Sequence, residues 1–253
     1  MRELLDAVAS GEVSPAEAEA RLAGYATTDA GRFDAAREQR RGVPEAVYAE
    51  GKTAEEVVDM LLAALETTGR GIATRVSDEQ VAAVREALDD AGLDADVRWH
   101  ERSDVLVIHG PEYEPPDVDA TVRVVTGGTV DRGPAGEARA IAVEMGATVE
   151  MVEDVGVAGI VRLLDRLDEL READVLVVAA GREGALPTVV AGLVDTPVIG
   201  LPTASGYGHG GDGEAALAGM LQSCTVLSTV NVDAGFVAGA QAGLIARAID
   251  DNT

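Results

Sequence analysis

The chain has 253 residues, of which 47% are apolar, so it is long enough for one large domain or for a main domain with a smaller companion. Its 45 acidic residues outnumber its 20 basic residues, and the formal net charge is -25. This negative charge disfavours nucleic acids and anionic membranes as partners, because both repel an acidic surface.

The acidic residues are scattered through the expected helices, only one basic residue is a lysine, and aromatic residues make up 3% of the chain. A coat of solvated carboxylates is expected of a protein from a very salty cytoplasm, where salt screens the self-repulsion. An ordinary acidic protein is the alternative. We interpret the charge as a halophilic adaptation and not as a sign of a particular function.

No apolar run reaches the roughly 18 residues that a membrane span needs, and residues 1–20 are an amphipathic acidic segment without a signal-peptide core. The single cysteine, Cys224, excludes an internal disulfide and a multi-cysteine metal site. We therefore expect a cytoplasmic protein that does not associate with membranes.

Residues 1–115 are predicted to form a small α+β domain. Helices are expected to begin at Ser14, Thr53 and Ser77, because each hydroxyl is followed three residues later by Glu or Gln, the capping-box spacing. Short strand-like runs are GIATRV at 71–76, ADVRWH at 95–100 and DVLVIHG at 104–110. The proline-rich segment 110–120 is predicted to be a linker.

Residues 116–253 are predicted to form a doubly wound α/β domain. The segment contains five successive units in which a strand-like run precedes a helix. The strands are apolar without alternation, which indicates a parallel sheet covered on both faces. The strand-like runs lie at 121–126, 148–152, 174–180, 197–202 and 226–232, and the helices are expected at 134–145, 157–171, 185–194, 213–221 and 236–249.

Ligands bind such sheets at the carboxyl ends of the strands, so the loops that follow the strands are the candidate site. The first loop, TGGTVDRGPAGEA at 126–138, contains Gly127, Gly128, Thr129 and Asp131. Glycine-freed amides at a helix start can bind an anion such as phosphate. A tight structural turn is the alternative for this motif.

The loops after the third and fourth strands also carry polar groups. Gly181, Arg182 and Glu183 follow the third strand, and a guanidinium beside a carboxylate can hold an anion and move a proton. A solvated ion pair is the alternative. Ser205 and Gly206 belong to the fourth loop, which has five glycines in residues 202–215 and can close over a ligand.

The loops after the second and fifth strands contribute Asp154, Asn231 and Asp233. A carboxylate here, near Asp131, could hold a magnesium ion together with a phosphate ligand. The spacing by itself does not assign the metal ligands.

Cys224 lies between the fourth helix and the fifth strand. In a simple doubly wound topology this position is at the edge of the sheet opposite the binding loops, and a helix C-terminus opposes thiolate formation. Topology therefore predicts a buried structural cysteine. A reactive thiol requires an irregular helix end or a site built between subunits.

Three segments of this chain resemble, in the same order, the LarB family of pyridinium-3,5-biscarboxylic acid mononucleotide synthases, which act in nickel-pincer cofactor biosynthesis. The segments are VEDVGVAGIVRLL, AAGREGALPTVVAGLVDTPVIGLPTASGYG and ALAGMLQSCTVLSTVNVDAGF. The front half resembles the family less specifically, in FDAAREQRRGVPEAVYAEGKTAEE at 33–56. The chain departs from the family pattern at Ala35 and Ala36, where a histidine is expected.

The resemblance implies a C-terminal domain similar to PurE, the aminoimidazole ribonucleotide carboxylase, with a flavodoxin-like fold and a homo-oligomeric, octameric assembly. It also implies that nicotinic acid adenine dinucleotide is carboxylated at ring carbon 5 and that its phosphoanhydride is hydrolysed, which releases AMP. CO2 or bicarbonate is then the carbon source, and magnesium assists the hydrolysis.

The same resemblance implies that Cys224 is the nucleophile that adds to ring carbon 4 and that Glu183 is the acid/base that removes the ring proton. The loop with Gly127, Gly128, Thr129 and Asp131 would hold phosphate or nucleotide. Two alternatives remain, a PurE-type carboxylase of the purine pathway and a non-catalytic nucleotide-binding protein.

Overall fold

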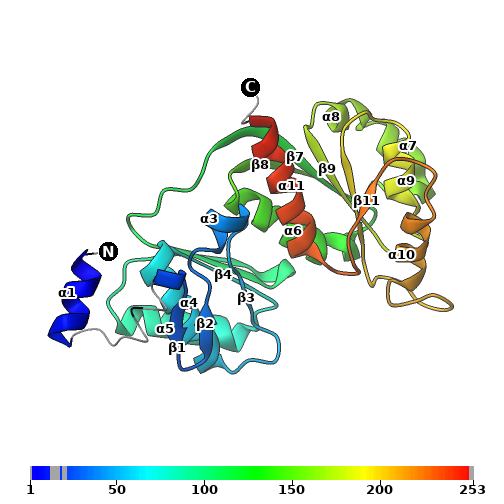
Figure 1. Cartoon of the computed structure of the whole chain (residues 1–253). Helices are drawn as coiled ribbons and strands as arrows, with labels where there is room; N and C mark the ends of the chain where they lie inside the picture. The colour runs from blue at the N-terminus through cyan, green and yellow to red at the C-terminus, as the bar shows by residue number, and fades with distance from the viewer. Residues whose placement is uncertain (1, 12–17, 19–21, 251–253) are drawn as a thin grey trace. The chain divides into compact units, whose positions relative to one another are not determined.

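The computed structural model describes residues 2–11, 18 and 22–250, and the chain divides into two compact units, Met1–Glu114 and Pro115–Thr253 (Figure 1). The helix start expected at Ser14 lies outside the described residues. None of the described helices is long and apolar enough to cross a membrane.

The first unit is built on a four-stranded sheet of order β3-β4-β6-β5. Strands β3 and β4 are parallel, whereas β6 is antiparallel to both of its neighbours. Helices α4 and α5 pack together, and their apolar residues share one core with the sheet. The bounds are α1 Arg2–Ser10, β1 Ala26–Thr28, β2 Gly31–Phe33, α3 Arg37–Arg41, β3 Val47–Tyr48, α4 Ala54–Thr68, β4 Arg70–Thr74, α5 Asp78–Asp90, β5 Asp96–His100, a 3-10 turn Glu101–Ser103 and β6 Val105–His109.

Two helices of this unit begin where the capping-box spacing predicts. The Thr53 hydroxyl accepts a hydrogen bond from the amide of Glu56 at 3.2 Å, and the Glu56 carboxylate accepts one from the amide of Thr53 at 2.8 Å. Ser77 and Gln80 make the same reciprocal pair at the start of α5. Each cap satisfies amides that would otherwise lack an acceptor, which stabilises a helix by about 1 kcal/mol.

The second unit is a five-stranded, fully parallel sheet of order β11-β10-β9-β7-β8. Counted along this unit, the order is 2-1-3-4-5, the flavodoxin-like arrangement. The predicted α/β fold is therefore confirmed. The strand bounds are β7 Val118–Thr126, β8 Ala147–Val152, β9 Val175–Ala180, β10 Val198–Pro202 and β11 Ser228–Thr229.

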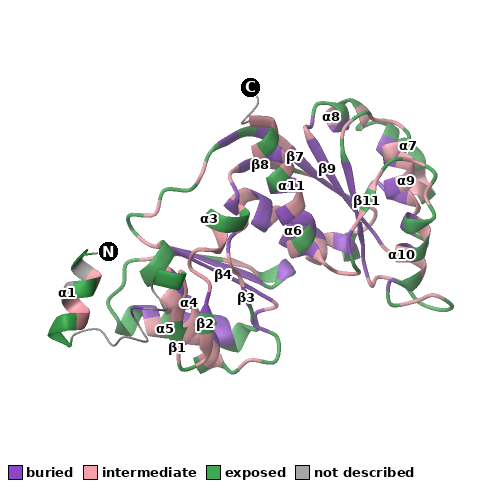
Figure 2. Ribbon diagram, in the orientation of Figure 1, coloured by how far each residue is buried: buried purple, intermediate pink, exposed green. Residues whose placement is uncertain are grey.

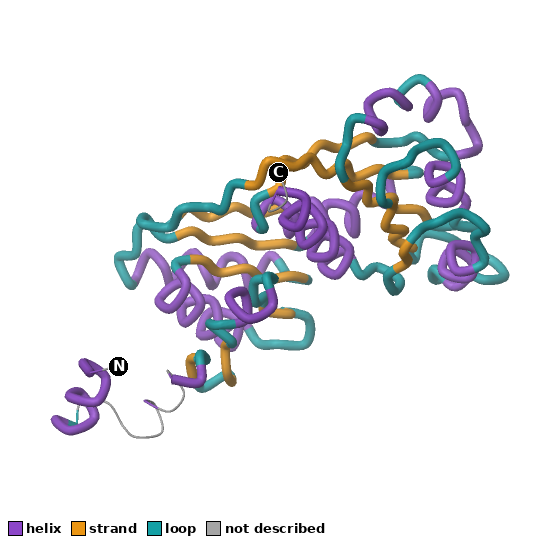
Figure 3. The backbone as a smooth tube through the Cα atoms, turned by 45° about the horizontal axis from the view of Figure 1, so that its top comes forward, coloured by secondary structure: helices purple, strands orange, loops and turns teal. Residues whose placement is uncertain are grey.

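Helices cover both faces of this sheet, as Figure 3 shows for the strands and helices of this unit. Successive residues of a strand point to opposite faces, so Val177 joins the core under α6 and α11 while Val178 joins the core under α7 to α10. The central strands are consequently buried along their whole length (Figure 2). The helix bounds are α6 Arg132–Glu144, α7 Ile160–Leu164, α8 Leu167–Arg171, α9 Ala185–Ala191, α10 Glu214–Leu221 and α11 Gly235–Asp250, with 3-10 turns at Thr129–Asp131 and Val157–Gly159.

The single helix expected over 157–171 is wrong, because the segment forms a 3-10 turn and two short helices. Gly159 is non-helical at φ -132° and ψ 63°, and Arg166 leaves the helical region at φ -112°. Each short helix buries one leucine, Leu163 or Leu170, in the core below. The two leucines are thus buried by two separate short helices and not by one continuous helix.

Helices α6 and α11 approach each other closely because α11 carries glycines at the contact. A Cβ atom on Gly239 would lie 2.3 Å from the carbonyl oxygen of Ala138, and one on Gly243 would lie 2.7 Å from the sulfur of Met145. These distances are far below van der Waals contact, so this layer depends on both glycines.

Candidate functional site

The candidate site lies at the carboxyl ends of β7, β9 and β10. Strand β7 lies between β8 and β9 in the sheet. The chain therefore adds β8 on one side of β7 and β9 on the other side, so the strand order reverses at β7. At such a reversal the following loops diverge and leave a crevice. A cavity of about 560 Å³ opens there; its lining comes from the loops after β7, β8, β9 and β10 and includes Gly127, Gly128, Val130, Asp131, Val157, Gly181, Arg182, Glu183, Leu186, Ser205, Gly206 and Tyr207.

Asp131 is the centre of a hydrogen-bond network that joins two of these loops. Its Oδ1 accepts hydrogen bonds from Thr203 Oγ1 at 2.6 Å and from Ser205 Oγ at 2.7 Å. Its Oδ2 accepts one from the Gly128 amide at 2.8 Å. Asp131 is 4% exposed, so the network replaces the water that this carboxylate has lost.

The two glycines of the first loop already use their amides within the protein. Gly127 donates to the carbonyl oxygen of Ala179 at 3.0 Å, and Gly128 donates to Asp131. The phosphate cradle that we expected from Gly127 and Gly128 therefore cannot use these two amides in this conformation. Thr129 is exposed and is not among the residues that line the cavity.

Gly181 holds the loop after β9 against the loop after β10. A Cβ atom on Gly181 would lie 1.9 Å from Ser205 Oγ and 2.1 Å from the Ser205 carbonyl oxygen. The amide of Arg182 donates to that same oxygen at 2.8 Å. The two loops thus form one wall, and only glycine can occupy position 181 without moving them.

Glu183 is an exposed carboxylate on a backbone that is held firmly in place. A Cβ atom on Gly219 of α10 would lie 2.3 Å from the Glu183 carbonyl oxygen, and one on Gly184 would lie 2.4 Å from the carbonyl oxygen of Ala216. Glu183 also lines a second cavity of about 300 Å³, together with Arg182, Tyr207 and His209. A carboxylate at this position can exchange a proton with a ligand in either cavity.

Three predicted residues lie at the same edge of the sheet but are not among the lining residues of the cavity. The Asp154 carboxylate pairs with Arg162 at 2.5 Å on the surface. Asp233 Oδ1 accepts the amide of Ala204 at 3.0 Å, which fastens the loop after β11 to the loop after β10. The Asn231 side chain accepts the amide of Val232 at 2.9 Å and is exposed.

Cys224 is exposed, so the prediction of a buried cysteine is wrong. Helix α10 ends at Leu221, and β11 begins only at Ser228, which leaves an irregular surface segment between them. Leu221 and Val226 on either side are 65% and 95% exposed. Cys224 is not among the residues that line either cavity of the candidate site.

The carboxylates at this edge do not form a preformed magnesium cage. Asp131, Asp154 and Asp233 each have hydrogen-bond or ion-pair partners from the protein, as described above. The described residues contain no group of three or more His, Cys, Asp and Glu side chains placed to hold a metal ion.

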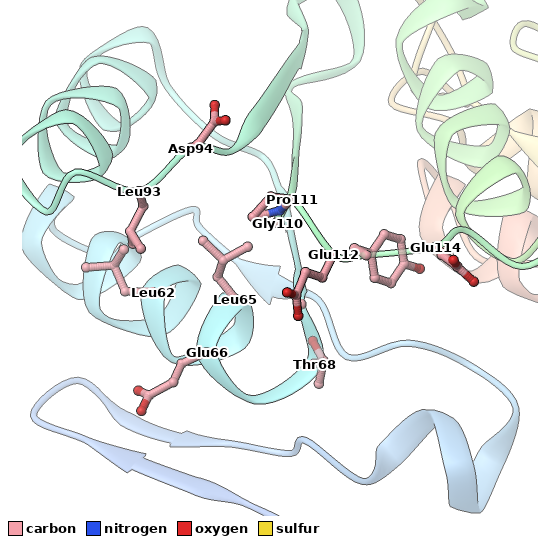
Figure 4. A pocket seen from close by; sticks show the side chains of 12 residues that line it. Leu62, Leu65, Glu66, Thr68, Leu93, Asp94, Gly110, Pro111, Glu112 and Glu114 are labelled. Atoms are coloured by element: carbon pink, nitrogen blue, oxygen red, sulfur yellow. The ribbon is translucent and has the colours of Figure 1, made fainter.

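The first unit has a cleft of about 620 Å³ beside α4, with Leu62, Leu65 and Leu93 among its lining residues (Figure 4). Its polar side chains include Glu66 and Glu112, and none of the described residues that line it is a lysine or an arginine. An apolar wall with carboxylates repels phosphate groups. The cavity at the carboxyl edge of the second unit therefore suits a nucleotide better than this cleft of the first unit does.

Sequence reasoning missed two members of the site, Thr203 and Tyr207. Thr203 is 1% exposed and follows β10 directly, and its position after a buried strand was the signal available. Tyr207 belongs to the glycine-rich fourth loop, and its ring lies under the Arg182 guanidinium, a contact that the sequence does not indicate.

A parallel sheet of this order, with a glycine-rich cavity at its reversal point, defines a flavodoxin-like α/β protein, a class in which ligands bind at the carboxyl edge of the sheet. Comparison with protein families narrows this class. The family model described as LarB/PurE-like N-terminal domain matches residues 25–110, and the one described as AIR carboxylase matches residues 121–252. The chain belongs to the LarB-like family, in which an N-terminal domain precedes a PurE-like carboxylase domain.

Individual proteins are also similar to this chain. An uncharacterized protein of Methanocaldococcus jannaschii is 37% identical over 254 residues, which cover 98% of this chain and 97% of the relative. The crystal structure of Treponema denticola PurE is 22% identical and covers 52% of this chain and 80% of its own, with a TM-score of 0.39. A flavodoxin from the domain Archaea is 13% identical and covers 52% of this chain and 99% of its own, with a TM-score of 0.34.

Proposed function

We propose that this protein carboxylates the pyridinium ring of nicotinic acid adenine dinucleotide at carbon 5 and hydrolyses the phosphoanhydride. The products are pyridinium-3,5-biscarboxylic acid mononucleotide and AMP. The observation that carries the proposal is the family membership of both domains, which assigns a carboxylase-related role. The exposed Glu183 carboxylate in a cavity at the sheet reversal supports it.

The proposed chemistry needs a nucleophile and a base. A pyridinium carbon is electrophilic and cannot attack CO2, so a thiolate first adds at carbon 4 and makes carbon 5 enamine-like. Carbon 5 then forms a bond to CO2. Glu183 removes the proton from carbon 5, and the thiolate leaves carbon 4 as aromaticity returns.

Cys224 is the only thiol of the chain, and its surface position agrees with this role. Cys224 lines neither of the two cavities that Glu183 lines in the same chain. We therefore propose a homo-oligomer, up to an octamer, in which a second copy brings its Cys224 to Glu183. The exposed Leu221 and Val226 support this assembly, because apolar side chains of this kind are typical of subunit contacts.

In the proposed reaction, magnesium binds together with the substrate phosphates. The carboxylates of the edge have partners within the protein, so we expect magnesium to arrive as a complex with the substrate phosphates. Arg182 is the lining cation that can pair with a phosphate or with the ring carboxylate.

The testing experiment incubates the full-length protein in high salt with nicotinic acid adenine dinucleotide, bicarbonate and magnesium, and identifies the products by mass spectrometry. We expect the dicarboxylated mononucleotide and AMP from the wild type, and neither from Cys224→Ala or Glu183→Gln. Binding of the dinucleotide without AMP release would indicate a non-catalytic nucleotide-binding protein. Turnover of aminoimidazole ribonucleotide that survives Cys224→Ala would indicate a PurE-type carboxylase.

A further inference from the structure

The Tyr207 ring lies beside the proposed site with a cation already on one face. The Cζ atom of Arg182 is 4.4 Å from the ring centroid, and both residues line both cavities. Tyr207 is 82% exposed, so burial in the core does not explain where the ring lies. A ring face that accepts a guanidinium at this distance can accept another flat organic cation.

The loop that carries this ring is hydrogen-bonded to the loop after β9. Ser205, two residues before Tyr207, donates its hydroxyl to Asp131 and accepts the amide of Arg182 through its carbonyl oxygen. Arg182 itself adopts the left-handed conformation, at φ 54°, which a non-glycine residue keeps only when its surroundings hold it. The ring and the guanidinium therefore meet across two loops that are hydrogen-bonded to each other.

The rest of the cavity wall suits a flat cation with an apolar edge. Val130, Val157 and Leu186 supply apolar surface, and Glu183 supplies a negative charge to the lining of the same cavity. Arg182 is the cation that now occupies the ring face, and His209 lines only the adjoining cavity.

Resting on the proposed function, we propose that the face of Tyr207 which Arg182 covers is the binding surface for the positively charged pyridinium ring. The pyridinium ring takes the place of the guanidinium on the tyrosine. Arg182 stays in the cavity wall and becomes available to the carboxylate or phosphates of the same substrate. Because only the charged ring accepts a thiolate, Tyr207 selects the reactive form of the dinucleotide.

The test measures two dissociation constants by isothermal titration calorimetry on the full-length protein. One ligand is nicotinic acid adenine dinucleotide, and the other is its reduced dihydropyridine form, which keeps the riboses and phosphates but has lost the ring charge. In Tyr207→Leu we expect the Kd of the charged form to rise about five- to thirty-fold, the loss of one cation–π contact, and the Kd of the reduced form to stay within about twofold.

Tyr207→Phe keeps the aromatic face and is expected to retain the preference for the charged form. Tyr48→Leu is the matched control, because Tyr48 is also exposed, at 53%, but lies in the first unit. Equal weakening of both ligands in Tyr207→Leu would show that Tyr207 only shapes its loop, and an unchanged Kd would show that it does not contact the ring; either overturns the inference while the proposed reaction stands. If the wild type binds neither ligand, the proposed function itself fails.

Discussion

Thr203 donates a hydrogen bond of 2.6 Å to Asp131, and this contact joins residues that are 72 positions apart in the chain. Both side chains are buried, at 1% and 4% exposed. The carboxylate also accepts Ser205 Oγ and the Gly128 amide, so it is the point at which the loops after β7 and β10 are fastened together.

Thr203→Val should therefore lower the free energy of unfolding of the second unit by about 1–2 kcal/mol. Valine has nearly the shape of threonine but no hydroxyl, so the buried Asp131 carboxylate loses one hydrogen-bond donor. Asp131→Ala should cost more, about 2–3 kcal/mol, since two hydroxyls and one amide lose their acceptor. Differential scanning calorimetry of the full-length protein in high salt measures these changes. Thr148→Val, at an exposed position of β8, is the control, and an equal effect there would contradict the role of the network.

Gly181→Ala should disrupt the candidate site, because the added Cβ would lie 1.9 Å from Ser205 Oγ. We expect a loss of about 1–3 kcal/mol in stability and at least tenfold weaker binding of the dinucleotide, since the two loops must separate. Gly192→Ala is the control, because its nearest neighbour would lie 3.4 Å away, an ordinary contact. Binding that is equally strong in both variants would show that position 181 does not shape the site.

The Cys224 thiol should react with the disulfide reagent dithiobis(nitrobenzoate) in the folded protein, and one thionitrobenzoate should be released per chain. Nicotinic acid adenine dinucleotide should slow this reaction if the ring binds beside the thiol, as we propose. The rate of thionitrobenzoate release with and without the dinucleotide measures both effects. If the thiol reacts only after denaturation, Cys224 is covered in solution and the first prediction is wrong. If the dinucleotide does not change the rate, Cys224 does not lie beside the bound ring and the second prediction is wrong.

Glu169 in α8 should titrate below the ordinary range of a glutamate. Its hydrogen bond from Arg166 lowers the pKa, with a further contribution from the attraction of the two charges. The contact therefore stabilises the fold above the pKa of the unfolded chain, and this contribution is lost as the pH falls through the lower pKa of the folded state. It is small and sensitive to salt, because the pair is at the surface.

An NMR titration of the Glu169 side chain checks this shift. In Arg166→Gln the pKa should return toward the ordinary value. A pKa that is the same with and without Arg166 would show that the pair does not form in solution.

The order of elements in the second unit followed from its sequence because buried parallel strands are apolar without alternation, and because glycine, proline and capping residues mark where helices begin and end. The same reasoning located the helix starts at Thr53 and Ser77. It failed over 157–171, where Leu163 and Leu170 are buried by two separate helices. A continuous helical pattern does not contain that break, since tertiary packing decides it.

The sequence by itself determined the α/β class and the family resemblance, and it predicted the two-part organisation and the loops that carry Gly181, Arg182, Glu183 and Ser205 as the candidate site. These features depend on local composition and spacing, which the chain carries without folding. Only the tertiary structure decided that Asp131 is engaged by Thr203 and Ser205, that Asp154 turns to Arg162, that Cys224 is exposed and that Arg182 covers Tyr207. The contacts of Asp131 and Arg182 join loops that follow different strands, and strand order brings those loops together, which no local pattern specifies.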